Sequence, residues 1–300
     1  MTSATVSTPV LAHDSVRKSS ARKSSAPPHE RTPRLTFAGV LRSERIKLAS
    51  LRSIRVTLLL TLLGGLALSV LIAWAWSTEV GGPDSMLAAD AVGLQTYLLM
   101  VSTFTAPFLA LVFGVLGVFA VSSEYSSGMI LSTLTAVPRR TPVFVAKAIV
   151  TAVLAAVTAL VLVSGALVAA IAFLPESAAQ LGSPIVISGV LGTVAYLVLF
   201  ALLSFGISAL LRSTAGGIAV VAGIAFVVPV ALQVLMMTNW EWVPRVSMLL
   251  PAELGSVLSR GFVDAAPGGI GYWGALALMT AWAAVAVIPA AIAFKRRDAR

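Results

Sequence analysis

Long apolar runs separated by short polar connections dominate the pattern of this sequence. Six runs contain no Asp, Glu, Arg or His, and they cover residues 56–76, 97–121, 143–174, 185–211, 216–237 and 273–294. A helix needs about 20 apolar residues to cross a hydrocarbon core of about 30 Å. Hydrocarbon cannot satisfy open backbone groups, and these runs are too long and too uniformly apolar for the strands of a barrel. The pattern therefore predicts an all-α integral membrane protein with six transmembrane helices.

The composition supports a membrane protein and limits its chemistry. Of the 300 residues, 58% are hydrophobic and 11% are charged, whereas soluble domains have about 25% charged residues. There is no cysteine, which excludes a disulfide framework, a thiolate metal site and a thiol nucleophile. The first apolar run is longer than the core of a secretory signal, so we expect it to be retained as a span.

The positive charges are distributed unequally along the chain. Of the 21 Lys and Arg residues, only Arg245 and Arg260 fall in the connections on one side of the predicted bundle, and 19 fall on the other. By the positive-inside rule, both termini are predicted to be cytoplasmic, which requires an even number of spans. This placement accounts for the net charge of +9 by contact with membrane lipids and argues against a nucleic-acid partner.

Two segments precede the first span. Residues 1–34 are rich in Ser, Thr, Pro, Arg and Lys, which predicts a disordered basic cytoplasmic tail. Residues 35–55 have helical spacing, and their apolar members fall within an arc of roughly 100°. These members are Phe37, Val40, Leu41, Leu48 and Leu51. We therefore expect an amphipathic helix along the cytoplasmic interface.

Glu44 lies in the middle of that apolar arc, where a carboxylate facing lipid would be unfavourable. We expect it to have a protein partner. The alternative is a tilted helix that leaves Glu44 in the head-group layer beside Arg45 or Lys47.

The connection between the second and third runs, residues 124–147, is polar, basic and spaced like a helix. Ile130, Leu134 and Val137 follow the 3.6-residue period, and Pro138 ends the pattern. The acidic residue near the start and the two arginines just past the end suit the helix dipole. A short cytoplasmic helix that docks on another protein is one interpretation, and a tight surface loop is the other.

The predicted spans offer no catalytic chemistry. No span interior holds a charged relay of the kind that ion-coupled carriers use, and no nucleophile has a base or metal partner within the bilayer. A phosphate-cradling loop needs Gly-Lys-Ser or Gly-Lys-Thr, and none of the five lysines follows a glycine. We therefore predict no enzyme activity, cofactor or metal site in this chain, and any energy has to come from a partner.

Two cytoplasmic motifs resemble those of the permease subunits of type-2 ATP-binding-cassette (ABC) exporters, particularly actinobacterial ones. Before the first span, such subunits have Ser-Glu-x-x-Lys-Leu, found here as Ser43, Glu44, Lys47 and Leu48. After the second span they have Glu-Tyr-x-x-Gly, a Pro-Arg-Arg turn and a Lys that opens the third span. The corresponding residues here are Glu124, Tyr125, Gly128, Pro138, Arg139, Arg140 and Lys147.

The resemblance implies a permease domain over residues 56–297, in a bacterial plasma membrane, that exports a drug, peptide, lipid or other amphipathic compound. It also implies a second permease copy and a separate nucleotide-binding ATPase that binds ATP and Mg. In that case Glu44 would pair with Arg139 or Arg140, or with the ATPase. The implied ATPase contacts are Glu44, Lys47, Leu48, Glu124, Tyr125, Gly128, Leu134, Pro138, Arg139, Arg140 and Lys147. An ion-coupled or facilitative carrier, and a membrane scaffold or sensor, remain as alternatives.

Small residues, prolines and one long connection complete the expectations for the bundle. Ala110 with Gly114, and Ala219 with Gly223, have the spacing that allows two helix backbones to approach closely. Prolines are expected to kink three spans, at Pro107, Pro229 and Pro289. The long connection 238–272 is apolar and broken by prolines, and we hypothesise that it folds back against the bundle.

Overall fold

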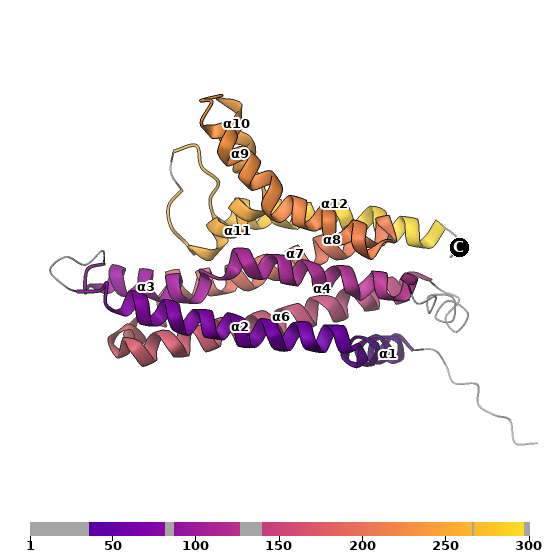
Figure 1. The fold of residues 1–300 in the computed structure, drawn as a ribbon, viewed down its shortest axis with the longest axis horizontal. Helices are drawn as coiled ribbons and strands as arrows, with labels where there is room; N and C mark the ends of the chain where they lie inside the picture. The colour runs from indigo at the N-terminus through magenta and orange to yellow at the C-terminus, as the bar shows by residue number, and fades with distance from the viewer. Residues whose placement is uncertain (1–35, 82–86, 127–139, 266, 297–300) are drawn as a thin grey trace, which may run out of the picture. The chain divides into compact units, whose positions relative to one another are not determined.

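The computed structural model describes residues 36–81, 87–126, 140–265 and 267–296, which all belong to one compact unit, Leu35–Arg300 (Figure 1). Most of these residues are helical, with no β-strand among them beyond a single bridge between Val80 and Leu87. The predicted tail, residues 1–34, lies outside the described residues. So does most of the predicted cytoplasmic helix, at residues 127–139.

Thirteen helical segments follow one another in the described part of the chain. The first six are α1 (Phe37–Ser50), α2 (Arg52–Ser77), α3 (Ala91–Thr103), α4 (Ala106–Ser126), α6 (Arg140–Phe173) and the short η1 (Pro175–Gln180). The others are α7 (Pro184–Leu211), α8 (Thr214–Ala222), η2 (Gly223–Val227), α9 (Val228–Met236), α10 (Trp242–Ser247) and α11 (Pro251–Ser259). The last helix, α12 (Tyr272–Arg296), makes a thirteenth segment and ends the described chain.

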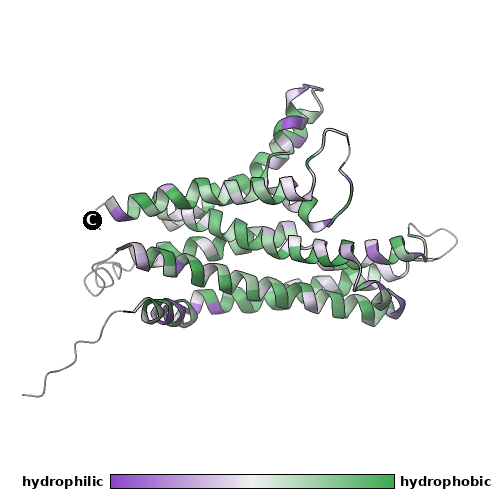
Figure 2. Ribbon diagram, turned by 180° about the vertical axis from the view of Figure 1, so that it is seen from behind, coloured by the Kyte–Doolittle hydropathy of each residue, from purple (hydrophilic) through white to green (hydrophobic). Residues whose placement is uncertain are grey.

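Six of these helical stretches are long and apolar enough to cross a membrane, which confirms the predicted number. They are Arg52–Ser77, Ala91–Ser123, Thr141–Phe173, Pro184–Leu211, Thr214–Met236 and Tyr272–Lys295. In Figure 2 the hydrophobic residues cover the long helices, and hydrophilic residues are concentrated in α1 and near helix ends.

Proline interrupts two of the six stretches more sharply than a simple kink. The second stretch breaks between α3 and α4, and Pro107 lies in the first turn of α4, where its missing N–H costs no helical hydrogen bond. In the fifth stretch, the π-helical turn Gly223–Val227 comes just before Pro229. The wider turn makes room for the proline ring against the preceding carbonyl. Pro289 lies inside α12 without ending it.

Helix α7 lies at the centre of the bundle, packed against α4, α6, α11 and α12. Its close approach to α4 depends on Gly117, where an added Cβ would lie 2.1 Å from the carbonyl oxygen of Ala201. Gly114, predicted with Ala110 to allow close packing, lies against Phe200 of α7 and Val221 of α8. The same prediction for Ala219 and Gly223 is wrong within this chain. Ala219 is exposed, and nothing lies within 4 Å of a Cβ added at Gly223.

The long connection 238–272 does fold back against the bundle. Its helix α11 packs between α7 and α12, with Leu254 and Leu258 fully buried. The hydroxyls of Thr193 and Ser259 are 2.9 Å apart, and the Tyr272 hydroxyl donates to the carbonyl oxygen of Ser188 over 3.1 Å. Apolar burial and buried hydrogen bonds together hold this segment on α7.

The predicted helix 35–55 is shorter in the structure. Thr36 caps α1 by accepting a hydrogen bond from the Gly39 amide over 3.2 Å. Leu51 is extended, with ψ of 115°, and separates α1 from α2. Arg52 and Arg55 therefore belong to the first span helix and not to α1. No proline or glycine occurs at that break, so the spacing of apolar residues predicted one continuous helix across it.

Candidate functional site

The buried face of α1 is directed at protein. Val40, Glu44 and Leu48, which lie four residues apart and so share one face, are the buried residues of the helix. Val40 packs with Val143 and Ala146 of α6. Phe37, at the edge of the predicted apolar arc, is 45% exposed. A helix whose buried stripe contains a carboxylate requires a basic partner at that position.

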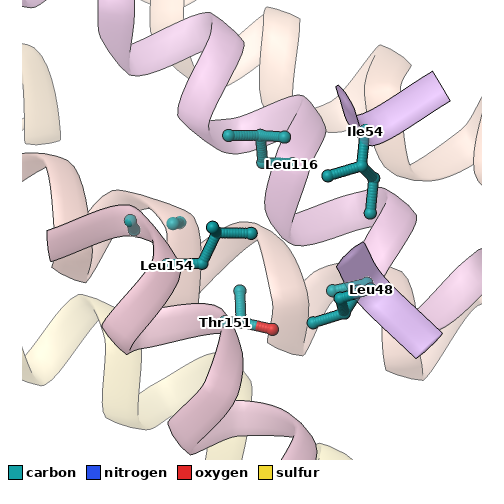
Figure 3. Close-up of a pocket in the computed structure, with 8 residues that line it drawn as sticks. Leu48, Ile54, Leu116, Thr151 and Leu154 are labelled. Carbon is teal, nitrogen blue, oxygen red and sulfur yellow. The ribbon is translucent and has the colours of Figure 1, made fainter. Parts of the chain in front are cut away.

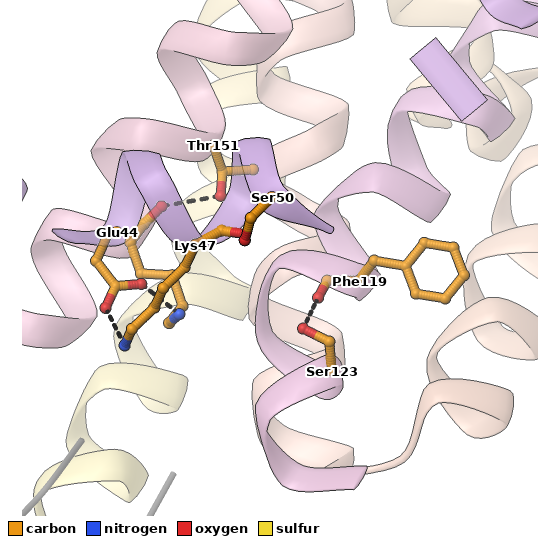
Figure 4. A network of polar contacts seen from close by, with 7 residues as sticks. Glu44, Lys47, Ser50, Phe119, Ser123 and Thr151 are labelled. Carbon is orange, nitrogen blue, oxygen red and sulfur yellow. Dashed lines mark hydrogen bonds and ion pairs between the residues drawn. The ribbon is translucent and has the colours of Figure 1, made fainter. Parts of the chain in front are cut away.

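That partner is Lys147 of α6. Its Nζ atom donates to Oε2 of Glu44 over 2.5 Å, across 103 positions of sequence. The two side chains are 5% and 1% exposed. Lys47, one turn along α1, donates to Oε1 of the same carboxylate over 2.9 Å (Figure 4) and is 24% exposed. Each carboxylate oxygen therefore accepts a hydrogen bond from a separate lysine.

This cluster holds α1 against α6. A buried ion pair contributes little net stability, but the loss of one partner leaves an uncompensated charge and costs about 3–5 kcal/mol. The pair therefore strongly favours the arrangement in which α1 lies against the start of α6. We name this arrangement the α1–α6 junction, defined by Glu44, Lys47 and Lys147.

Apolar contacts connect the junction to the rest of the bundle. Phe144, one turn before Lys147, has its ring centroid 5.2 Å from that of Phe205 in α7 and 5.5 Å from that of Phe294 in α12. Such aromatic pairs add to the free energy of area burial. Displacement of α1 would therefore disturb three spans, through α6 and the helices that contact Phe144.

The space beneath the junction is nearly filled. Leu48, Ile54, Leu116, Thr151 and Leu154 surround a cavity of about 10 Å³ (Figure 3). A void of this size holds at most one water molecule. It has no room for a substrate, so the junction is a packed joint between helices.

Helix α6 is long enough to act as a lever. Its 34 residues extend for about 50 Å at 1.5 Å per residue, whereas a hydrocarbon core is about 30 Å thick. Lys147 lies two turns after the start of the same continuous helix. A movement applied to α1, or to the chain before Arg140, would therefore be transmitted along the whole third span.

The structure brings four of the predicted contact residues together. Glu44, Lys47, Leu48 and Lys147 meet at the α1–α6 junction. Glu124 and Tyr125 belong to the last turn of α4, and Arg140 is the first residue of α6, but their side chains lie outside the described residues. Gly128, Leu134, Pro138 and Arg139 lie outside them altogether. In Figure 1, α1, the end of α4 and the start of α6 all lie at one end of the bundle.

Glu44 has a protein partner, as expected, because its carboxylate accepts hydrogen bonds from Lys147 and Lys47. Its expected pairing with Arg139 or Arg140 involves side chains that lie outside the described residues. The head-group alternative is wrong, because the Glu44 side chain is 1% exposed.

Among the described residues, no three His, Asp or Glu side chains come together in an arrangement that could hold a metal ion. Residues 86–300 match a family described as "Protein of unknown function (DUF2705)". No curated protein matches the chain.

Proposed function

The chain belongs to the DUF2705 family, and we propose that it is the non-catalytic permease subunit of an ATP-driven ABC transporter of the type-2 kind. A separate nucleotide-binding subunit would hydrolyse ATP and drive a pair of permease copies between inward-open and outward-open states. From the resemblance of the two cytoplasmic motifs to those of type-2 exporters, the cargo leaves the cell and is a drug, peptide, lipid or other amphipathic compound.

One observation carries the proposal. The two motifs that resemble those of such permeases lie apart in the sequence, at residues 43–48 and 124–147. The Glu44–Lys147 ion pair joins a residue of the first to a residue of the second. A surface that couples an ATPase to a permease needs its contact residues close together and a rigid helix that leads from them into the membrane. The α1–α6 junction and the continuous helix α6 supply both.

Charge placement supports a cytoplasmic position for this surface. Arg42, Arg45, Lys47 and Arg52 lie in or beside α1, at the end of the bundle where α4 ends and α6 begins. Arg245 and Arg260 belong to the connection between the fifth and sixth spans. Under the positive-inside rule, the α1 end faces the cytoplasm, where a soluble ATPase has access to it.

The exposed apolar surface leaves room for an assembly of two copies within lipid. Only 17% of the first span and 11% of the fifth are buried within the chain, against 61% of the second. A polytopic subunit that works alone leaves such surface to lipid, whereas a paired subunit uses part of it for the second copy.

Co-purification from native membranes tests the proposal. The chain, tagged at its C-terminus, is isolated after mild crosslinking and gentle solubilisation, and its partners are identified by mass spectrometry. We expect a nucleotide-binding ATPase in stoichiometric amount, and its loss when residues 127–139 are replaced by a Gly/Ser linker of equal length. Recovery of the chain without any nucleotide-binding protein, under crosslinking, would contradict the proposal and favour a carrier or a scaffold.

A further inference from the structure

An open apolar groove lies beside the junction, between α1, α2 and α6. Its volume is about 800 Å³. Aliphatic side chains line it, including Leu41 of α1, Leu58 of α2, and Val153 and Val157 of α6. The two valines are 56% and 54% exposed. The groove is therefore accessible from the side of the bundle that the spans present to lipid.

Three arginines line the same groove, Arg42 and Arg45 from α1 and Arg55 from α2. None of the described residues that line it is acidic. Arg42 and Arg45 make no hydrogen bond or ion pair with any residue that the structure describes. Arg55 donates one hydrogen bond, over 3.2 Å, to the carbonyl oxygen of Ser50. Its other N–H groups can still donate to a ligand. The groove therefore combines three positive charges with an aliphatic wall.

The dimensions of the groove match one leaflet. On α6 the lining runs from Ile149 to Val157, which corresponds to about 12 Å of helix. Half of a hydrocarbon core is about 15 Å. The arginines lie on α1 and at the start of α2, so the charge is concentrated at the end of the groove where the first span begins.

We propose that this groove binds one anionic phospholipid from the surrounding leaflet. Arg42, Arg45 and Arg55 hold the phosphate, because guanidinium groups match phosphate oxygens in bidentate geometry. An acyl chain lies against Val153 and Val157. A zwitterionic lipid carries its own cation and gains little from three arginines, and a free phosphate cannot use the aliphatic wall. The inference depends on the groove alone and not on the transport function.

Retention of lipid by the purified chain tests this inference. The protein is exchanged into micelles with equal amounts of phosphatidylglycerol and phosphatidylcholine of identical acyl chains, and bound lipid is counted by native mass spectrometry. We expect about one phosphatidylglycerol per chain and little phosphatidylcholine. The triple variant Arg42→Gln, Arg45→Gln, Arg55→Gln should weaken retention by about fivefold for each arginine removed. Val153→Trp should abolish it by filling the groove.

Two controls and a competition experiment make the result decisive. Arg52→Gln removes a charge at the same helix end outside the groove lining, and Val161→Trp adds a ring to α6 outside it. Both should retain the lipid. Equal retention of the two lipids, unchanged retention in the triple variant, or displacement by inorganic phosphate alone overturns the proposal. If Val153→Trp changes the oligomeric state and leaves lipid retention unchanged, the groove belongs to a contact with a second copy.

Discussion

At the scale of single residues, the ion pair between Glu44 and Lys147 determines where α1 lies. The carboxylate is 1% exposed, and both of its oxygens accept hydrogen bonds from lysines. A charge with this degree of burial tolerates only one arrangement of its surroundings, because any displacement leaves it without compensation. The pair therefore contributes more to the specificity of helix placement than to net stability.

We expect Glu44→Ala to lower the free energy of unfolding by about 3–5 kcal/mol, because Lys147 would remain buried without a counter-charge. The exchange Glu44→Lys with Lys147→Glu should recover part of that loss. Unfolding by increasing SDS, followed by tryptophan fluorescence, measures both effects. Glu176→Ala, which removes an exposed carboxylate on η1, is the matched control and should change stability by less than about 0.5 kcal/mol. Equal effects of the single substitutions at Glu44 and Glu176 would show that the pair is not a structural constraint.

At the scale of helices, hydropathy predicted the six spans because hydrocarbon forces every backbone group into its own helix. The predicted and observed second spans differ mainly at the start, which is Ala91 and not residue 97. Asp90 caps that helix by accepting a hydrogen bond from the Gly93 amide over 2.8 Å. Such a cap starts the helix a turn or more before the long apolar run from which the span was predicted.

The contacts between helices could not be predicted in the same way. Glu44 and Lys147 meet across 103 positions, and periodicity within one helix carries no information about which helix will face it. The spacing of Ala219 and Gly223 resembled a packing motif as much as that of Ala110 and Gly114 did, yet Gly223 has open space around it. Sequence reasoning identified Glu44 as a residue that needs a partner. Only the arrangement of the helices identifies Lys147 as that partner.

The packing of α11 on α7 leads to a prediction about two glycines. A Cβ added at Gly192 would lie 2.2 Å from the carbonyl oxygen of Leu258, whereas one added at Gly223 meets nothing within 4 Å. Gly192→Ala should therefore displace α11 and destabilise the protein by about 1–3 kcal/mol. Gly223→Ala should be neutral or stabilising by up to about 1 kcal/mol. SDS unfolding of the two variants in parallel tests the contrast, and equal destabilisation would mean that α11 does not depend on this close approach.

At the scale of the whole membrane-spanning unit, the unequal distribution of charge determines the proposed direction of insertion. The α1 end carries Arg42, Arg45, Lys47 and Arg52, while η1, between the third and fourth spans, carries Glu176. Translocation of a connection rich in Lys and Arg is unfavourable, so the two ends of the bundle are not equivalent during insertion. The proposed coupling surface depends on this orientation, because an ATPase can reach only the cytoplasmic end.

Because the natural chain has no cysteine, single cysteines can report this orientation without background. Glu176→Cys on η1 should react with a membrane-impermeant maleimide in intact cells, since Glu176 is exposed and is predicted to face outside. Ser50→Cys at the end of α1, also exposed, should react only after the membrane is opened. Labelling is read by a mass shift on a gel, with the cysteine-free parent as the blank. Reaction of Ser50→Cys in intact cells, with protection of Glu176→Cys, would show that the topology is the reverse of the proposed one. The α1–α6 junction would then be on the outside, where no ATP-driven partner could act on it.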